Sequence, residues 1–425
     1  MLNIKCYSSY TNRVFIYALF WITILFQITA IKYIWGLEIL SRVCNIIIIL
    51  ILFIYVIIYS CNMQYNKNIC LFYVLPGVLV GIGYIINISF NSINNLNLIS
   101  YYGGLFPWLL YLAMPGIVIQ NKEFFENLWK QYYYFMLIAV IAGLIEYYVV
   151  LTGLSSPKLI STSGGEFLSG KVSLFLGLED GSIHYRFYGC FLEPGSLAMY
   201  LLPAIAYALY YNKYVGIILL PLGIYFSDSF GGIISGLCLI IIAVFVSLNK
   251  GRSIYNIATS LILVICLIIF PSVANFYAVQ YEEKNESRIV REEAFSNTVS
   301  NIPAMIINNP IGYTLGENTL SNIESEYYYG ANFTPGNALY MGGVISFIGY
   351  LFVLIVSIVA SLMSILKRNL SRQQKTVFTS IIVLMPFIFQ RSVVWDNAIY
   401  SLLFVPTILK YIEYKKERII PTYVL

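Results

Sequence analysis

Charged residues are scarce in this chain, and histidine is almost absent. Only 11% of the 425 residues are charged and His184 is the single histidine, whereas about 25% of a soluble domain is charged. A water-soluble fold of this length could not enclose the 59% of residues that are hydrophobic, but a lipid bilayer can accommodate them. The net charge of +5 is spread along the chain without a basic stripe, so no nucleic-acid partner is indicated.

Residues that hold metals and nucleotides are equally sparse. The three aspartates (Asp180, Asp228 and Asp396) are far apart, so no DxD motif exists, and the seven cysteines contain no CxxC pair. No glycine-rich Walker-type loop is found either. These absences argue against a zinc site, a disulfide framework and ATP-driven pumping within this chain. We therefore expect no metal and no cofactor.

Long apolar runs, by contrast, follow one another almost from end to end. A membrane-spanning helix needs roughly 20 apolar residues, and continuous runs are typical of helices rather than of the alternating strands of a barrel. We predict an all-α integral membrane protein with about 12 transmembrane helices, as a single polytopic membrane domain over residues 1–425. The predicted spans cover residues 14–34, 43–60, 70–89, 98–119, 131–151, 191–211, 213–228, 231–248, 254–274, 337–366, 376–392 and 397–411.

The positive charges predict the orientation of these spans. With both termini cytoplasmic, sixteen of the 25 Lys and Arg residues lie on the inner side, as the positive-inside rule requires. This topology leaves two long segments outside, a loop over residues 152–190 and a large loop over 275–336 before the last three spans. Loops of this length are uncommon unless they are functional or disordered. We therefore expect the outer face to carry the function.

The most informative local pattern runs from His184 to Tyr200. Pro194 favours the first position of a helix, so the sixth span is predicted to begin at Glu193–Pro194, with the positive end of its dipole facing outward. Helix N-termini attract phosphate, and Arg186 could add a bidentate contact to a diphosphate. If the intervening stretch is helical, Arg186 and Glu193 are about two turns apart. The residues also fit a simpler interpretation, in which Arg186 reaches the interface and Glu193 merely favours the dipole.

The large outer loop carries a second pair of cations, Arg288 and Arg291. They form a second candidate clamp for an anion. The alternative is an ordinary ion pair with Glu286, Glu292 or Glu293, and the sequence alone does not separate the two interpretations.

Apolar residues follow in the same loop. Phe295, Ile302 and Ile306 are spaced for one face of a helix, which Pro303 would kink or interrupt.

Three other charged residues lie within or beside predicted spans. Glu146 is in the fifth span, and a carboxylate inside the membrane suggests function by default, although this one could equally extend to the nearby interface. Arg391 and Asp396 flank the last outer hairpin, where they could simply pair.

Taken together, these residues resemble the O-antigen polymerase and ligase superfamily of bacterial surface-polysaccharide assembly. The architecture of about 12 spans with a large outer loop before the last three covers most of the chain. Three patterns carry the resemblance, in this order: Arg186-x-x-Gly189-x-x-x-Glu193-Pro194, then Ser287-Arg288 to Arg291 with Pro310-Ile-Gly312, then Asn337 with Gly342-Gly343 and Gly349.

The resemblance implies a metal-independent glycosyltransferase, a multi-pass protein of the bacterial cytoplasmic (inner) membrane. Such an enzyme polymerises oligosaccharide repeat units linked to undecaprenyl diphosphate on the periplasmic face and releases undecaprenyl diphosphate. Membrane lipid, a chain-length regulator and a flippase are the further partners expected. The resemblance implies diphosphate binding by outer-face arginines, here Arg186 with Arg288 or Arg291. We expect Glu193, or secondly His184, to act as the base, and Asn337, Glu146 and Arg391 to be supporting residues.

Two departures from the family pattern bear on the choice within it. Gly336 precedes Asn337 where ligases usually carry a histidine, which favours a polymerase. Ser229-Phe-Gly231 stands where Ser-Arg-Gly is frequent, which removes one phosphate contact that a ligase would use. The alternatives are an O-antigen ligase that transfers glycan to lipid A-core, and a transporter of polysaccharide or lipid-linked sugar. A transporter would be expected to show two matching halves, and a purely structural protein would leave the outer arginines without a role.

Overall fold

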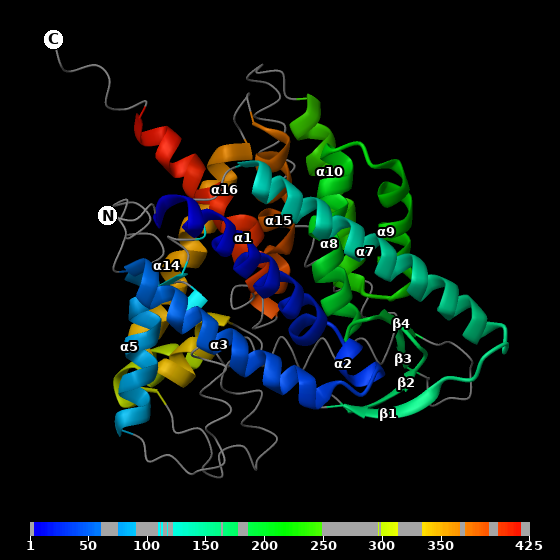
Figure 1. Ribbon diagram of the computed structural model, residues 1–425, viewed down its shortest axis with the longest axis horizontal. Coiled ribbons are helices and arrows are strands. Elements are labelled where there is room, and N and C mark those ends of the chain that lie inside the picture. Colours follow the sequence, from blue (N-terminus) through cyan, green and yellow to red (C-terminus); the bar gives the residue numbers. More distant parts are fainter. Residues whose placement is uncertain are drawn as a thin grey trace. The chain divides into compact units, whose positions relative to one another are not determined.

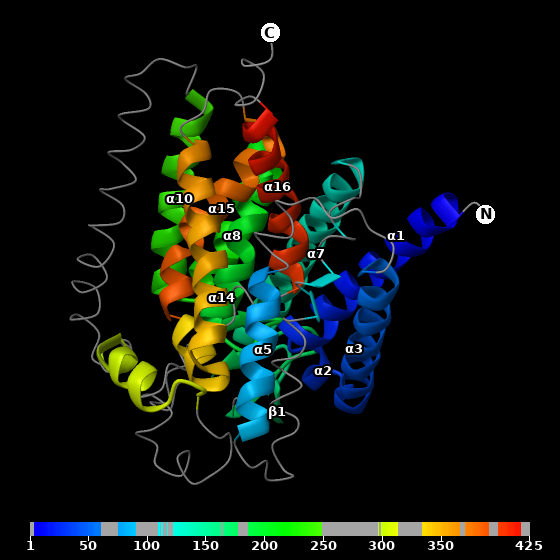
Figure 2. The same ribbon diagram turned by 90° about the vertical axis from the view of Figure 1, so that its left-hand side faces the viewer.

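The fold is mostly helical and includes one small antiparallel sheet (Figures 1 and 2). The computed structural model describes residues 4–60, 75–90, 109–110, 112–113, 117, 122–162, 165–176, 186–248, 296, 299–312, 334–365, 370–390 and 398–417. The helices are α1 (Ile4–Ile22), the π-helix η1 (Thr23–Ile28), α2 (Ile31–Ile34), α3 (Glu38–Ser60), α5 (Leu75–Phe90), α7 (Lys122–Leu151), α8 (Pro194–Tyr210), α9 (Tyr214–Phe226), α10 (Phe230–Leu248), α14 (Thr334–Ile365), α15 (Arg372–Gln390) and α16 (Ala398–Glu417). The strands are β1 (Lys158–Thr162), β2 (Gly165–Ser169), β3 (Leu174–Leu176) and β4 (Arg186–Gly189).

Three helical segments are long and apolar enough to cross a membrane: Glu38–Ile57, Lys122–Leu151 and Gly342–Ile365. Shorter apolar helices of 10–17 residues occur in the described part of the chain, among them α8 and α9. The prediction is therefore confirmed in its general form: the fold is mostly helical and contains helices that could cross a membrane. The number of about 12 spans and their orientation stay predictions. The spans predicted over 254–274 and most of 98–119 lie outside the described residues.

The first predicted span is interrupted. Its helix continues through η1 to Ile28, but Thr29 is extended (φ −102°, ψ 157°), and α2 begins only at Ile31. The amide of Ala30 donates a hydrogen bond of 2.7 Å to the carbonyl oxygen of Cys190. A partner 160 residues away in the chain thus takes the place of the missing helical bond at this break.

The chain forms two compact units. The first contains Met1–Ile48, Gln120–Pro271 and Ser361–Leu384, and the second contains Ile49–Ile119, Ser272–Ala360 and Met385–Leu425.

Helix α8 is the core of the first unit, and α7, α9 and α10 pack against it (Figure 1). All of its residues except Ser196 and Leu209 are buried, so it lacks the polar face of a surface helix. The Tyr132 hydroxyl of α7 donates to the carbonyl oxygen of Tyr200 at 2.6 Å. Small residues allow α10 to approach closely, because a Cβ atom at Gly232 would lie 2.5 Å from the Cβ of Ala198.

The four strands form an antiparallel sheet in the order β1-β2-β3-β4. Phe167, Leu174 and Tyr188 bury one cluster of its side chains together with Ala30, which directly precedes α2. Residues 152–190 were predicted to form only a loop in an all-α protein, so the sheet is a structural element that the sequence did not predict. The sheet gives the end of the first unit a fixed shape.

In the second unit, α5 and α14 lie side by side (Figure 2), and the Ser346 hydroxyl donates to the carbonyl oxygen of Val80 at 2.9 Å. A helix over Val299–Asn308 packs Ile302 and Ile306 against α14, around a cluster of Met305, Leu339 and Tyr340. These two isoleucines share one face, as their spacing predicted. Pro303 lies within this helix and does not end it.

Candidate functional site

The first pattern identified in the sequence lies where the sheet meets α8. Arg186 is the first residue of β4 and pairs with Leu176 of β3. The conditional interpretation of this stretch as helical is therefore wrong, because Arg186 to Gly189 form a strand. Gly189 ends the strand at φ +57°, a conformation that favours glycine. The chain then turns, with the amide of Phe191 donating to the Tyr188 carbonyl oxygen at 3.2 Å.

Glu193 and Pro194 begin α8, as the sequence predicted. Glu193 is the extended N-cap residue (φ −145°, ψ 146°) and Pro194 occupies the first turn. The carbonyl oxygen of Glu193 accepts the first helical hydrogen bond, from the amide of Leu197 at 3.0 Å. Its side chain is exposed and makes no capping hydrogen bond to the helix. A carboxylate is thus presented at the positive end of a helix whose other residues are nearly all buried.

The C-terminal end of α7 supports the sheet through aromatic contacts. The ring of Tyr147 lies 6.0 Å from that of Phe175 and 5.6 Å from that of Phe187, between centroids. One turn earlier, a Cβ atom at Gly143 would lie 2.9 Å from the ring of Phe187. The absence of a side chain at Gly143 lets α7 approach β4, and β4 also contacts α8 and α9. The strand that begins with Arg186 is therefore held by three helices.

Glu146 holds the turn between β2 and β3. Its carboxylate accepts hydrogen bonds from the backbone amides of Lys171, Val172 (3.0 Å) and Ser173 (2.8 Å). Three successive amides that converge on one anion form the kind of concave backbone site that usually binds an external anion. Gly170 is required beside it, since a Cβ atom there would lie 2.3 Å from the Glu146 carboxyl carbon.

This geometry assigns Glu146 a role that the sequence analysis did not foresee. The two interpretations from the sequence were a functional intramembrane carboxylate and a side chain that extends to the interface. Neither included the turn at residues 171–173 whose amides bind the Glu146 carboxylate. The signal in the sequence was the segment Gly170-Lys-Val-Ser173, because a loop of this length that contains glycine is typical of a hairpin between two short strands.

A second set of contacts connects this turn to the first part of the chain. The indole nitrogen of Trp35 donates to the carbonyl oxygen of Lys171 at 2.8 Å, and Ala30 donates to Cys190 as described above. Cys190 is buried at the corner where β4 meets Ala30, and burial raises the pKa of its thiol to about 12. The thiol is therefore a packing group and not a nucleophile at neutral pH.

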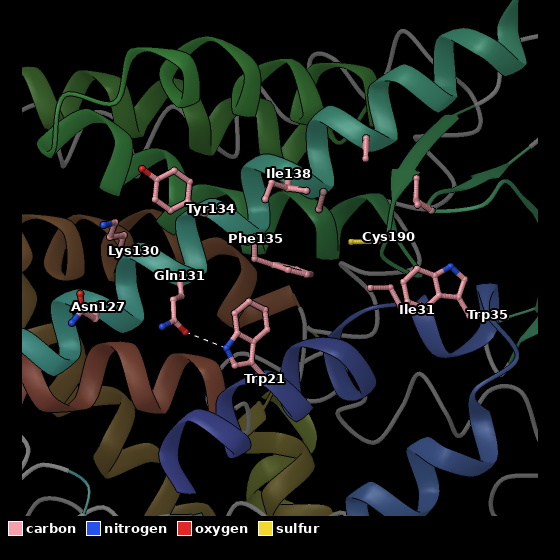
Figure 3. Close-up of a pocket in the computed structure, with 13 residues that line it drawn as sticks. Trp21, Ile31, Trp35, Asn127, Lys130, Gln131, Tyr134, Phe135, Ile138 and Cys190 are labelled. Carbon is pink, nitrogen blue, oxygen red and sulfur yellow. Dashed lines mark hydrogen bonds between the residues drawn. The ribbon is translucent and has the colours of Figure 1, made fainter. Parts of the chain in front are cut away.

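A groove of about 510 Å³ lies along α7, between this corner and α1 (Figure 3). Most of its wall is apolar or aromatic, including Trp21, Phe135 and Ile138. Polar side chains gather at one end, where Figure 3 shows Lys130 near Gln131. None of the sequence patterns predicted this groove.

The second and third sequence patterns meet in the second unit. The carbonyl oxygen of Pro310 accepts the amide of Val344 at 2.9 Å, and Ile311 accepts the side-chain amide of Asn87 at 2.8 Å. Helix α14 is interrupted at Gly343 (φ 66°, ψ −167°), where a Cβ atom would lie 2.3 Å from the Pro310 oxygen. Close packing of the backbone at Pro310 therefore explains why glycine occupies position 343, without reference to any substrate.

The remaining candidate residues lie in the second unit or outside the described residues. Asn337 lies in α14 of the second unit. His184, Arg288, Arg291 and Arg391 lie outside the described residues. Of the predicted site residues, Arg186 and Glu193 are connected by one short ordered segment of the first unit, and Glu146 supports the same sheet.

No protein-family model matches the chain, and no curated protein matches it significantly in sequence.

Proposed function

We propose that the protein polymerises oligosaccharide repeat units linked to undecaprenyl diphosphate, at the periplasmic face of the bacterial inner membrane. One observation carries the proposal: Arg186 begins β4 and Glu193 is the N-cap of α8, so a cation and a carboxylate flank a single fixed turn. The resemblance of this pattern to the O-antigen polymerases supplies the substrate class. The apolar helices are consistent with a substrate carried by a membrane lipid.

In the proposed reaction, an acceptor hydroxyl attacks the anomeric carbon of a lipid-linked sugar. The bond between that carbon and the diphosphate oxygen breaks, and undecaprenyl diphosphate leaves with the bonding electron pair. Arg186 and the N-terminus of α8 stabilise the negative charge that develops on the diphosphate. Glu193 accepts the hydroxyl proton. Arg288 or Arg291 of the large outer loop provides the second cation.

The rigid surroundings of β4 support this division of roles. A guanidinium recognises a diphosphate by paired hydrogen bonds of fixed geometry, and such recognition requires a backbone that does not move. Three helices contact β4, and Glu146 fixes the turn that leads into β3. Glu146 is therefore a supporting residue in the proposal and does not touch the substrate.

The test is chain extension by purified protein that receives only lipid-linked repeat units. We expect a ladder of lengthened lipid-linked chains, undiminished by a chelator. Arg186→Ala should abolish or greatly shorten the ladder, and Arg186→Lys should restore it only in part, because lysine lacks the planar fork of arginine. Lys158→Ala, which removes an exposed cation from β1 of the same sheet, is the matched control and should leave the ladder unchanged. A normal ladder from Arg186→Ala would remove Arg186 from the mechanism.

A ligase is the nearest alternative, and it differs in its acceptor. Gly336 before Asn337, in place of the histidine usual in ligases, favours the polymerase. If no lengthening occurs until lipid A-core is added, and single repeats are then transferred to it, the protein is a ligase. Uptake of lipid-linked sugar into vesicles without any new glycosidic bond would instead indicate a transporter.

A further inference from the structure

The groove along α7 has a polar end and an apolar remainder. Thirteen residues from the first unit line it. Asn127, Lys130 and Gln131 lie at one end, and Trp35 and Cys190 at the other (Figure 3). The polarity of the wall thus changes along the length of α7. A phospholipid shows the same change, from a polar headgroup at one end to apolar acyl chains at the other.

The dimensions fit one leaflet of a bilayer. Gln131 and Ala142 are eleven residues apart on α7 and both line the groove, which corresponds to about 16 Å of helix. The hydrocarbon region of one leaflet is about 15 Å thick, half of the bilayer core. An acyl chain lying along Phe135, Ile138 and Ala142 would therefore end near the far end of the groove.

The walls of the groove are held in place by specific contacts. The indole nitrogen of Trp21 donates to the side-chain oxygen of Gln131 at 3.1 Å. The Trp21 ring also meets that of Phe135 edge-on, with 6.0 Å between centroids and 78° between planes. These contacts join α1 to α7 through residues that line the groove, and so they fix the positions of the two walls relative to each other.

The charge of the groove selects the headgroup. Lys130 is the single charged residue among those that line it, and its side chain is exposed. Within the described part of the chain, no carboxylate lies within ion-pair distance of Lys130, whereas Lys122 pairs with Glu126 at 3.4 Å. The amide of Asn127, also exposed, lies one turn away and adds a hydrogen-bond donor. This end of the groove is complementary to a phosphate.

We propose that the groove binds one anionic phospholipid of the surrounding bilayer, with its phosphate at Lys130 and Asn127 and one acyl chain along Phe135, Ile138 and Ala142. The lining residues at the end near Trp35 include no cation, so the charge of the lining favours the orientation with the phosphate at Lys130. This inference does not depend on the proposed enzymatic function.

The first test is native mass spectrometry of the detergent-purified protein, titrated with phosphatidylglycerol or phosphatidylcholine. We expect one tightly bound phosphatidylglycerol and weaker binding of phosphatidylcholine. Lys130→Gln should lower the affinity for phosphatidylglycerol about fivefold, the effect of one cation near an anionic lipid. Lys158→Gln makes the same charge change on β1, away from the groove, and should have no effect. Equal affinities of Lys130→Gln and the wild type, or of the two lipids for the wild type, would overturn the proposal.

The second test fills the part of the groove assigned to the acyl chain. Ala142→Trp should displace the bound phosphatidylglycerol, whereas Ile145→Trp should not, because Ile145 is exposed on the same helix but does not line the groove. Retention of the lipid by Ala142→Trp would contradict the proposal. The proposal would also be contradicted if Ala142→Trp lost binding of undecaprenyl phosphate and kept binding of phosphatidylglycerol. That result would show that the groove binds a polyprenyl lipid.

Discussion

The carboxylate of Glu146 accepts a hydrogen bond from the backbone amide of Ser173 at 2.8 Å, although 27 residues separate them in the chain. The contact joins the last turns of α7 to the residue that precedes β3. The amides of Lys171 and Val172 donate to the same carboxylate. One side chain on a predicted membrane helix therefore determines the shape of a turn outside that helix, and through β3 it supports the strand that begins with Arg186.

Removal of this carboxylate should destabilise the first unit. Glu146→Ala leaves three amides without their acceptor, and we expect a cost of about 1–3 kcal/mol in the free energy of unfolding. Glu146→Gln keeps one acceptor oxygen and should cost less. The measurement is the thermal midpoint of the detergent-purified protein, followed by limited proteolysis at Lys171. Glu123→Ala, which removes an exposed glutamate from the first turn of the same helix, is the control. A midpoint for Glu146→Ala that equals that of the control would contradict this role.

Gly170 and Glu146 should show energetic coupling. The methyl group of Gly170→Ala would lie 2.3 Å from the Glu146 carboxyl carbon, so this variant should lower the thermal midpoint. In the Glu146→Ala background the same substitution should cost less, because its obstacle is gone, and a double-mutant cycle measures the difference. Gly236→Ala meets no atom within 4 Å in the interior of α10, so it should leave the thermal midpoint unchanged or raise it slightly. Additive effects at Gly170 and Glu146 would show that the close approach does not exist.

Hydropathy and a single proline were sufficient to predict where α8 begins. Pro194 can occupy only the first turn of a helix without the loss of a hydrogen bond, so the start was determined locally. The face shared by Ile302 and Ile306 was predictable for a similar reason, since the periodicity of a helix is visible in its own residues. Neither prediction needed a distant partner.

The features that the sequence did not reveal depend on residues far apart. The break at Ala30 is stabilised by Cys190, and nothing around Ala30 indicates that partner. The strands of the sheet have three to five residues each, too few for a clear alternation. Glu146 has the same local sequence whether it extends to the interface or binds the turn at Lys171. Such contacts require the tertiary arrangement before they can be recognised.

The reactivity of Cys190 provides a test of the corner between α2 and the sheet. Burial raises the pKa of this thiol to about 12, so about one molecule in 10⁵ is thiolate at pH 7, against roughly one in 30 for an ordinary cysteine. A raised pKa favours the neutral thiol, and reactivity should increase as the pH rises toward 12. We expect no labelling of Cys190 by N-ethylmaleimide at pH 7 in the folded protein and rapid labelling after denaturation, measured by peptide mass spectrometry. Cys44, which is partly exposed, is the reference, and equal labelling of both cysteines would show that the corner is open.

The orientation of α7 can be tested with residues at its two ends. The positive-inside distribution predicts that Lys122 is cytoplasmic and Lys158 is outside, and both side chains are exposed. Lys158→Cys, in a cysteine-free background, should react with an impermeant maleimide in intact spheroplasts. Lys122→Cys should react only after the membrane is permeabilised. Labelling of both positions in intact spheroplasts would mean that α7 does not cross the bilayer, and the reverse pattern would invert the topology.

Glu193 offers the most direct test of the proposed chemistry, because Glu193→Gln keeps the size of the side chain and removes its charge. The side chain is exposed and makes no capping hydrogen bond to α8. A charge near a helix N-terminus typically contributes about 0.3–1 kcal/mol, so we expect the variant to insert and fold. If Glu193 is the general base, chain extension should fall by about 10²-fold or more. Glu166→Gln changes another carboxylate of the same sheet, in β2, and should retain activity. A fully active Glu193→Gln, together with an inactive His184→Ala, would transfer the role of base to His184, and activity in both variants would exclude both residues.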